Sequence, residues 1–156
     1  MLTPEEIQAI LPHRPPFLFL DRIESVDYGQ GAVGVIDDVG RFEYWLRGHF
    51  PGYPVLPGAL LVEALAEVGA VAVLGLPEHH GKLAVLTGLN GWRFRRPARP
   101  GQPIRLEVSL TALRGTYGRG HARATAADEL LAEGELSFAV IPRPDDWAAT
   151  LPEPNP

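Results

Sequence analysis

The segment GHFPGYPVLPGALLVEALAEVGAVAVLGL, residues 48–76, decides how this chain folds and what chemistry it can carry. Residues 59–74 are strong helix formers with apolar side chains on almost every face, which is typical of a helix covered by protein on several sides. Two carboxylates, Glu63 and Glu67, interrupt this helix, and His49 precedes it across a turn rich in Pro and Gly. Because carboxylates are costly to bury, these residues are the first candidates for a functional site.

The same segment is long enough to be compared with a membrane helix, since about 20 apolar residues suffice to cross a bilayer. Its two central glutamates argue against that interpretation. A charged carboxylate in the middle of a membrane costs about 2.5 to 3.5 kcal/mol. We therefore expect no membrane span and a helix that is buried within protein.

Length and composition indicate one domain. The chain has 156 residues, of which 46% are hydrophobic, enough for a single core. We expect this domain to cover residues 1–141 and the Pro-rich residues 142–156 to form a poorly ordered tail. Because cysteine is absent, disulfides, thiolate zinc sites and cysteine nucleophiles are excluded. The N-terminal segment lacks the pattern of a signal peptide, so we expect a cytoplasmic protein.

The charge distribution is acidic overall but locally basic. The formal net charge is -5, which argues against nucleic-acid binding, because phosphate neutralisation needs a basic face. One segment, RFRRPAR, nevertheless concentrates positive charge at Arg93, Arg95, Arg96 and Arg99. These arginines, called the arginine patch below, are either a solvated strand end or a docking surface for an acidic partner or a phosphate.

The remaining sequence predicts one short helix and about six strands. Thr3, Pro4 and Glu6 have the pattern of a capped helix start, and the prolines of LPHRPPF end that helix. We expect strands in segments separated by turn residues, namely FLFLDRIESVDYG, GAVGVIDDVG, LAVLTGLNGWRFRRP, QPIRLEVSLTALRG, YGRGHARATAAD and ELLAEGELSFAVI. The segment RFEYWLRGHFPGYPVLPG is rich in Pro and Gly, so we expect it to be irregular. The predicted fold class is α+β, an antiparallel sheet laid against one long helix.

The residues around the helix start have the chemistry of a proton-transfer site. Glu63 and Glu67 are four positions apart and so share one helix face. A buried carboxyl tends to become neutral and can then donate a proton, while a histidine such as His49 can accept one. Gly58 opens the helix, where free amides favour developing negative charge. Taken singly, Glu63 could be a structural carboxylate bonded to the backbone and His49 a turn histidine.

Three segments resemble the hot-dog-fold (3R)-hydroxyacyl-acyl-carrier-protein dehydratases of bacterial type II fatty acid synthesis. They are LPHRPPFLFLDRI at 11–23, GHFPGYPVLPGALLVEALAE at 48–67 and WRFRRPARPGQPIRLEVSL at 92–110. The resemblance implies a hot-dog fold, in which a sheet wraps around one central helix, with subunits paired into homodimers that are often assembled as trimers of dimers. It also implies dehydration of a hydroxyacyl thioester carried by acyl carrier protein, which gives the trans-2-enoyl thioester.

The resemblance assigns roles to individual residues. His49 matches the catalytic histidine and Glu63 the catalytic glutamate, which in this family come from opposite subunits. Gly58 matches the glycine whose amide polarises the thioester carbonyl, and Phe50 helps to shape that pocket. A related branch that also isomerises the double bond has aspartate where this chain has Glu63, so the sequence favours dehydration alone.

Two departures from the family bear on this assignment. The family usually has glutamine at the position of Glu67, and a second carboxylate there is expected to raise the pKa of one or both glutamates. RFEYWLRGHF also replaces an asparagine-led aromatic run, which puts substrate choice in question more than reaction type.

The resemblance strengthens docking of an acidic carrier protein as the interpretation of the arginine patch. We expect no cofactor and no metal. The adjacent His79 and His80 are more typical of a solvated loop than of a metal site. We interpret His13 as structural and His121 as a surface strand residue. Alternatives within the same fold are a hydratase or thioesterase acting on acyl-coenzyme A, or a non-catalytic subunit that binds acyl thioesters.

Overall fold

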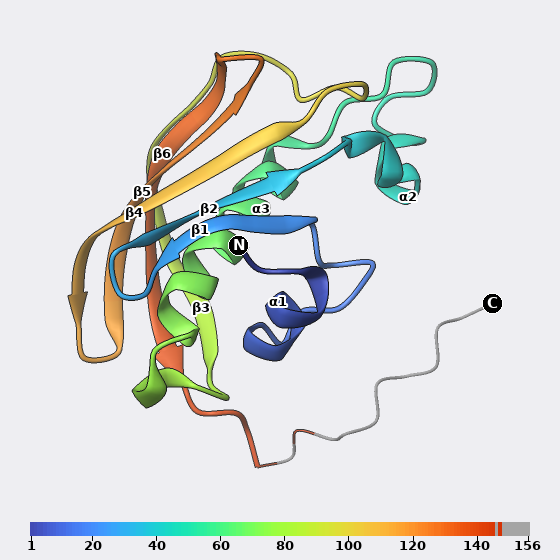
Figure 1. Ribbon diagram of the computed structural model, residues 1–156. Coiled ribbons are helices and arrows are strands. Elements are labelled where there is room, and N and C mark those ends of the chain that lie inside the picture. Colours follow the sequence, from blue (N-terminus) through green and yellow to red (C-terminus); the bar gives the residue numbers. More distant parts are fainter. Residues whose placement is uncertain (146, 148–156) are drawn as a thin grey trace.

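A curved antiparallel sheet wraps around one long helix in the computed structural model, which describes residues 1–145 and 147 (Figure 1). The sheet has six strands in the order β1-β2-β4-β5-β6-β3. The strands are β1 (Arg22–Asp27), β2 (Gly31–Ile36), β3 (Leu83–Phe94), β4 (Ile104–Arg114), β5 (Tyr117–Ala126) and β6 (Glu129–Ile141). The helices are α1 (Pro4–Ile10), α2 (Glu43–Leu46) and α3 (Gly58–Leu74), with single 3-10 turns η1 (Val39–Arg41) and η2 (Pro77–His79).

The long helix α3 forms the centre of the core, as the sequence predicts. Twelve of its residues are buried, and it packs against β1 to β5 on the inner face of the sheet. Gly34 in β2 allows this close approach, because a Cβ atom there would lie 2.7 Å from Cγ2 of Val68. The predicted hot-dog arrangement is confirmed, and the buried apolar surface of α3 accounts for much of the hydrophobic stabilisation.

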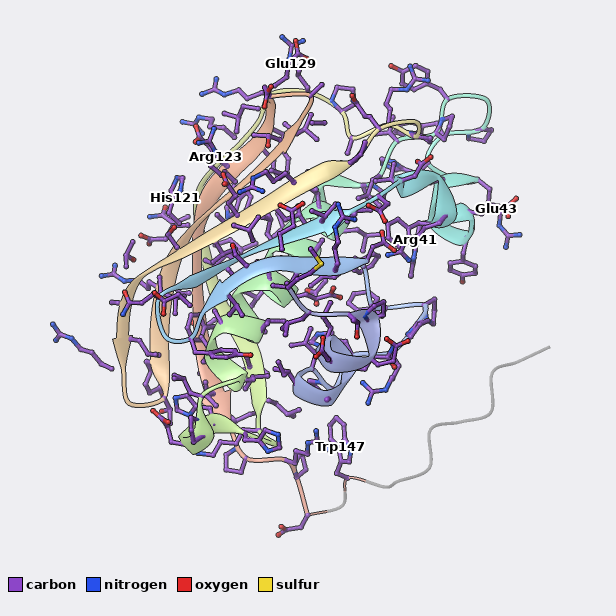
Figure 2. The ribbon with its side chains drawn as sticks, in the orientation of Figure 1. Arg41, Glu43, His121, Arg123, Glu129 and Trp147 are labelled. Atoms are coloured by element: carbon purple, nitrogen blue, oxygen red, sulfur yellow. The ribbon has the colours of Figure 1, made fainter. Side chains whose placement is uncertain are left out.

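Strand alternation also follows the sequence. In β4, Ile104, Leu106 and Val108 are buried against the helix, whereas Arg105 on the opposite face is exposed. Side chains on the outer face, including His121 and Arg123, point away from α3 (Figure 2). The alternation of apolar and polar residues along each strand therefore determines which face of the sheet covers the helix.

Strand β3 lies at the edge of the sheet and pairs only with β6 among the described residues. Its 12 residues expose several large apolar side chains, namely Val85, Leu86, Leu89 and Phe94. A long apolar edge strand is an unpaired hydrogen-bonding surface that favours association with another chain.

Some boundaries differ from the sequence prediction. Residues 17–21 were expected to begin the first strand, but β1 begins at Arg22. The preceding prolines cannot donate to a strand ladder, and the amide of Phe19 bonds to a side chain instead. The segment expected to lack any element contains α2, and η1 ends at its first residue, Arg41. The predicted helix at 59–74 begins one residue earlier, at Gly58.

Two further predictions concern the whole chain. Within the described residues, no helix is both long and apolar enough to cross a lipid bilayer. The predicted tail at 142–156 lies mostly outside the described residues, and the domain boundary at residue 141 therefore stays a prediction.

Candidate functional site

His49 lies in the loop between α2 and α3, where a backbone contact fixes its protonation pattern. Its Nδ1 atom is 2.8 Å from the carbonyl oxygen of Val55. A carbonyl can only accept a hydrogen bond, so Nδ1 carries the proton and the lone pair of a neutral ring is on Nε2. The ring is half-buried and stacks on Phe50, with 4.2 Å between centroids. His49 is therefore arranged to accept a proton at Nε2.

The start of α3 lies beside this histidine. Pro57 provides no side-chain cap, so the first amides of the helix, including that of Gly58, have no intrahelical acceptor. A Cβ atom at Gly58 would lie 2.9 Å from the Phe94 ring, which explains why glycine fits here. His49 and Gly58 line one pocket of about 290 Å³, bordered also by Arg95. The predicted base and the predicted carbonyl-binding amide are thus adjacent.

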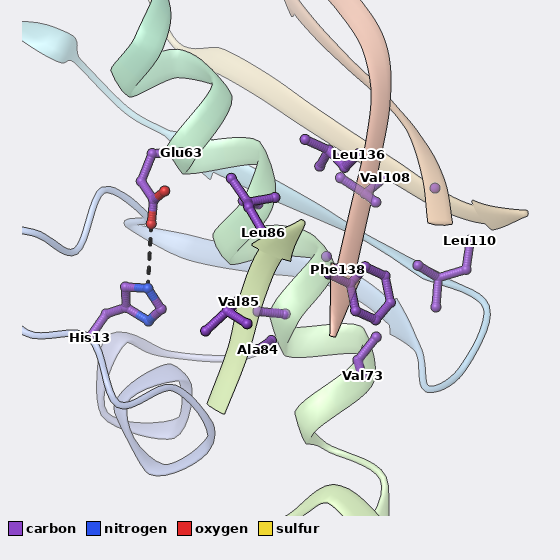
Figure 3. A pocket seen from close by; sticks show the side chains of 14 residues that line it. His13, Glu63, Val73, Ala84, Val85, Leu86, Val108, Leu110, Leu136 and Phe138 are labelled. Carbon is purple, nitrogen blue, oxygen red and sulfur yellow. Dashed lines mark ion pairs between the residues drawn. The ribbon is translucent and has the colours of Figure 1, made fainter. Parts of the chain in front are cut away.

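Glu63 faces a different pocket. Its Oε1 atom lies 3.4 Å from Nε2 of His13, and both side chains are about one-fifth exposed (Figure 3). The pocket has a volume of about 260 Å³ and is otherwise mainly apolar. Its lining comes from α3, β3, β4, β5 and β6 and includes Val73, Leu86, Leu110 and Phe138. This arrangement offers an acid at the side of a space suited to a hydrocarbon chain.

Glu67 lies one turn after Glu63 and is almost fully buried, with 1% of its surface exposed. Its Oε2 atom accepts a hydrogen bond of 2.9 Å from the amide of Phe19, while Oε1 has no hydrogen-bond partner among residues 1–145 and 147. Burial raises the pKa of Glu67 to about 8, opposed by the Phe19 amide and supported by the charge of Glu63. The raised pKa expected for this pair is therefore found at Glu67.

This burial predicts a pH-dependent stability. The pKa of Glu67 is about 8 in the folded state and has a reference value of 4.5, so between these values the folded chain binds one proton more than the unfolded chain. The associated stabilisation is complete below pH 4.5 and is lost as the pH rises to about 8. Compared with Glu67→Gln, the free energy of unfolding of the natural chain should fall by up to about 1.4 kcal/mol per pH unit in this window.

Denaturant unfolding of both proteins at several pH values measures this difference. Glu78→Gln, at an exposed position, serves as the matched control and should follow the natural chain. Parallel stability curves for the natural chain and Glu67→Gln would contradict the assignment of a buried neutral carboxyl.

His13 is the site residue that sequence reasoning missed. A ring nitrogen of His13 and one carboxylate oxygen each of Glu63 and Glu67 all lie within 4.8 Å of one another. His13 was interpreted as structural, but it contacts Glu63 across 50 positions of sequence, and the histidine and prolines of LPHRPPF were the only local signal. The three groups are close enough to hold a metal ion. Metal ligands must be deprotonated, and a protonated Glu67 is a poor ligand, so we assign these residues to proton transfer.

A single subunit does not bring His49 and Glu63 into one pocket. Glu63 also lines a shallow apolar hollow of about 550 Å³ with Leu89 and Phe94, on the side of the edge strand β3. Phe94 lines both this hollow and the His49 pocket. The predicted base and acid therefore lie in separate pockets that both border the edge strand β3.

All four members of the arginine patch are exposed, but their surroundings differ. Arg95 and Arg96 border the His49 pocket, and Arg96 forms an ion pair of 3.2 Å with Glu129. The guanidinium of Arg99 lies 4.0 Å from the centre of the Tyr53 ring. Arg93 projects from β3. The patch thus adjoins the mouth of the His49 pocket.

The other histidines lie apart from these pockets. His121 is exposed on β5, as predicted. The prediction that His79 and His80 are both solvated is wrong for His79, which is 5% exposed at the end of η2. The local sequence gave no sign of this burial.

Comparison with known proteins identifies relatives over most of the chain. A model of the FabA-like domain matches residues 11–135. A curated 3-hydroxyacyl-acyl-carrier-protein dehydratase FabZ from Chloroflexus aggregans is 53% identical over 140 residues, covering 90% of this chain and 96% of the relative. A FabZ dehydratase from Pelotomaculum thermopropionicum is also 53% identical over 140 residues, covering 90% and 99% of the two chains.

Solved structures with low sequence identity show the same fold. The dehydratase heterocomplex ApeI:P from Xenorhabdus doucetiae matches with a TM-score of 0.74 and 19% identity, covering 88% of this chain and 91% of the other. A hypothetical thioesterase protein with coenzyme A from Streptococcus pneumoniae matches with a TM-score of 0.59 and 11% identity, covering 78% and 85%. These similarities extend to the fold alone.

Proposed function

This chain belongs to the FabA-like domain family, and we propose that it is a hydro-lyase that removes water from 3-hydroxyacyl thioesters carried by acyl carrier protein in fatty acid biosynthesis. The observation that carries this proposal is the 53% identity to curated 3-hydroxyacyl-acyl-carrier-protein dehydratases over nearly their whole length. The product is the trans-2-enoyl thioester.

The pockets support this chemistry. His49 takes a proton from the α carbon at Nε2, and the bonding electrons move toward the thioester carbonyl. The amide of Gly58, at the positive end of α3, stabilises the charge that develops on that oxygen, with Phe50 holding the imidazole by stacking. The β hydroxyl then leaves as water with a proton from Glu63. The apolar pocket beside Glu63 binds the acyl chain.

A homodimer would complete this site, since His49 and Glu63 occupy separate pockets that both border β3. A second copy that pairs along β3 would cover Leu86, Leu89 and Phe94, which are exposed in the single chain. In an interface with two-fold symmetry, each subunit uses the same surface. The His49 pocket of one subunit would then face Glu63 of the partner subunit, and the reverse would hold for the second site. Assembly of three such dimers, like the cytoplasmic location, stays a prediction.

Product analysis tests the reaction. The purified protein is incubated with a 3-hydroxyacyl thioester on acyl carrier protein, and the products are separated. An enoyl thioester is the expected product. Release of free acid would instead identify a thioesterase, equal or better turnover of the coenzyme A thioester would favour a coenzyme A hydratase, and binding without turnover would indicate a non-catalytic subunit.

The arginine patch supplies a further prediction. Arg95→Glu combined with Arg96→Glu should raise KM for the carrier-bound substrate about tenfold, because it replaces attraction of an acidic carrier by repulsion near the pocket mouth. The kcat value should change much less. Raising the salt concentration should weaken binding by the natural chain and have little effect on the variant.

A matched control is Arg114→Glu, at an exposed position at the end of β4. Its KM should remain close to that of the natural chain. An equal rise in KM in the control, or retained salt sensitivity after Arg93, Arg95, Arg96 and Arg99 are all replaced, would count against the docking role of the patch.

A further inference from the structure

The proposed reaction raises a question about the source of the proton. The departing hydroxyl takes up one proton in each turnover, and Glu63 is the acid beside the apolar pocket. Its Oε1 atom lies 3.4 Å from Nε2 of His13. A second carboxyl close to Glu63 would give that proton a further holder, and this chain has one where the family usually has glutamine.

Glu67 has the geometry of such a holder. It follows Glu63 by one helical turn on the same face of α3. One of its carboxylate oxygens lies within 4.8 Å of a carboxylate oxygen of Glu63 and of a ring nitrogen of His13. One of its oxygens is held by the amide of Phe19. The other is buried and has no hydrogen-bond partner in the described part of the chain, so it is available to a neighbouring proton donor or acceptor.

The charges facing Glu67 come from three parts of the fold. Glu63 on α3 repels a second negative charge, and His13 approaches from the loop after α1. Arg41 of η1 favours the ionised form, but its guanidinium donates to the carbonyl of Phe19 and forms an ion pair of 3.1 Å with Asp21. Arg41 is therefore already neutralised in part by Asp21, and its effect on the pKa of Glu67 is smaller than that of burial.

We propose that Glu63 and Glu67 share one proton as a pair, so that Glu67, behind the reacting acid, holds the proton that Glu63 delivers to the departing hydroxyl. This inference rests on the proposed dehydratase function. Glu67–H transfers its proton to the Glu63 carboxylate, and Glu63 passes it to the hydroxyl, which leaves as water. His49 releases the proton taken from the α carbon to solvent, and the pair takes one back from solvent, so the cycle balances.

Glu67 is thus a positioning residue and a proton reserve, and it does not itself touch the substrate. Below the pH at which the pair becomes doubly ionised, one acid proton remains in the site. Above that pH no carboxyl proton is available, and turnover falls. The carboxyl of Glu67 therefore extends activity toward alkaline pH.

The pH dependence of kcat/KM in the natural chain and in Glu67→Gln tests this inference, with each profile normalised to its own maximum. The amide still accepts from the Phe19 amide but has no proton to give up and no charge to acquire. The alkaline limb should therefore move to lower pH by about one unit or more. Glu78→Gln, an exposed and distant change, should leave the limb in place. An unmoved limb, or one moved to higher pH, in Glu67→Gln overturns the inference.

Difference infrared spectroscopy supplies a readout that does not depend on turnover. The natural chain at neutral pH should show a carbonyl band of a protonated carboxyl that disappears as the pH passes about 8 and is missing from Glu67→Gln. In Glu63→Gln, which serves as a second variant if Glu67→Gln fails to fold, the band should titrate at lower pH, because the neighbouring negative charge is gone. Absence of the band from the natural chain at neutral pH overturns the inference.

The two readouts separate this inference from the proposed function. No turnover of any 3-hydroxyacyl thioester by the natural chain would refute the function, whatever the infrared band shows. Turnover with a pH profile that Glu67→Gln does not change would refute only the shared proton.

Discussion

His49→Ala lowers kcat/KM for a 3-hydroxyacyl thioester by at least about 100-fold, as does Glu63→Gln, because each change removes one partner of a general acid and base pair. Without the imidazole, no group with a free lone pair is held beside the amide of Gly58. Without the carboxyl, the hydroxyl must leave unprotonated. Initial rates of enoyl thioester formation measure both effects.

Matched variants separate loss of chemistry from loss of structure. His121→Ala removes an exposed imidazole from β5, and Glu78→Gln neutralises an exposed carboxyl in η2. Both should retain turnover, and all four proteins should have similar circular dichroism spectra. Turnover retained by His49→Ala or by Glu63→Gln would refute the assigned roles.

The fold was largely predictable because its determinants are local. The uninterrupted apolar run of α3 and the alternation in β4 each specify an element and its buried face. Turn residues separated the later strands, so that β6 was predicted with the bounds Glu129–Ile141 that the structure has. The missed helix α2 has only four residues, and its sequence lacks a side-chain cap, so no local signal distinguished it from a loop.

The candidate site was predictable only in part. The His49 loop and the start of α3 lie within ten residues of each other, and the motif that joins them is contained in one segment. The contact between His13 and Glu63 depends instead on how the loop after α1 passes over α3, which no local pattern specifies. The pKa of Glu67 is likewise raised by its burial in the folded chain, which outweighs the opposing hydrogen bonds from the Phe19 and Leu20 amides, so the sequence indicated a coupled pair without showing which member is buried.

The edge strand β3 connects the fold to the proposed chemistry. Its exposed apolar residues would favour aggregation of an isolated chain. They also border both the His49 pocket and the hollow beside Glu63. An interface along β3 would bury Leu89 and Phe94 and exclude water from the acid and the base at once. Association and catalysis are thus expected to depend on the same surface.

Mixing two inactive variants tests this account most directly. His49→Ala and Glu63→Gln subunits are coexpressed with different affinity tags, and turnover of the mixture is compared with that of each variant alone. If each site combines His49 of one subunit with Glu63 of the partner subunit, a mixed dimer has one site with both changes and one intact site. Random pairing then restores about a quarter of the natural turnover per subunit. No recovery in verified mixed dimers would contradict the account, because it would mean that no site combines the two residues from different subunits.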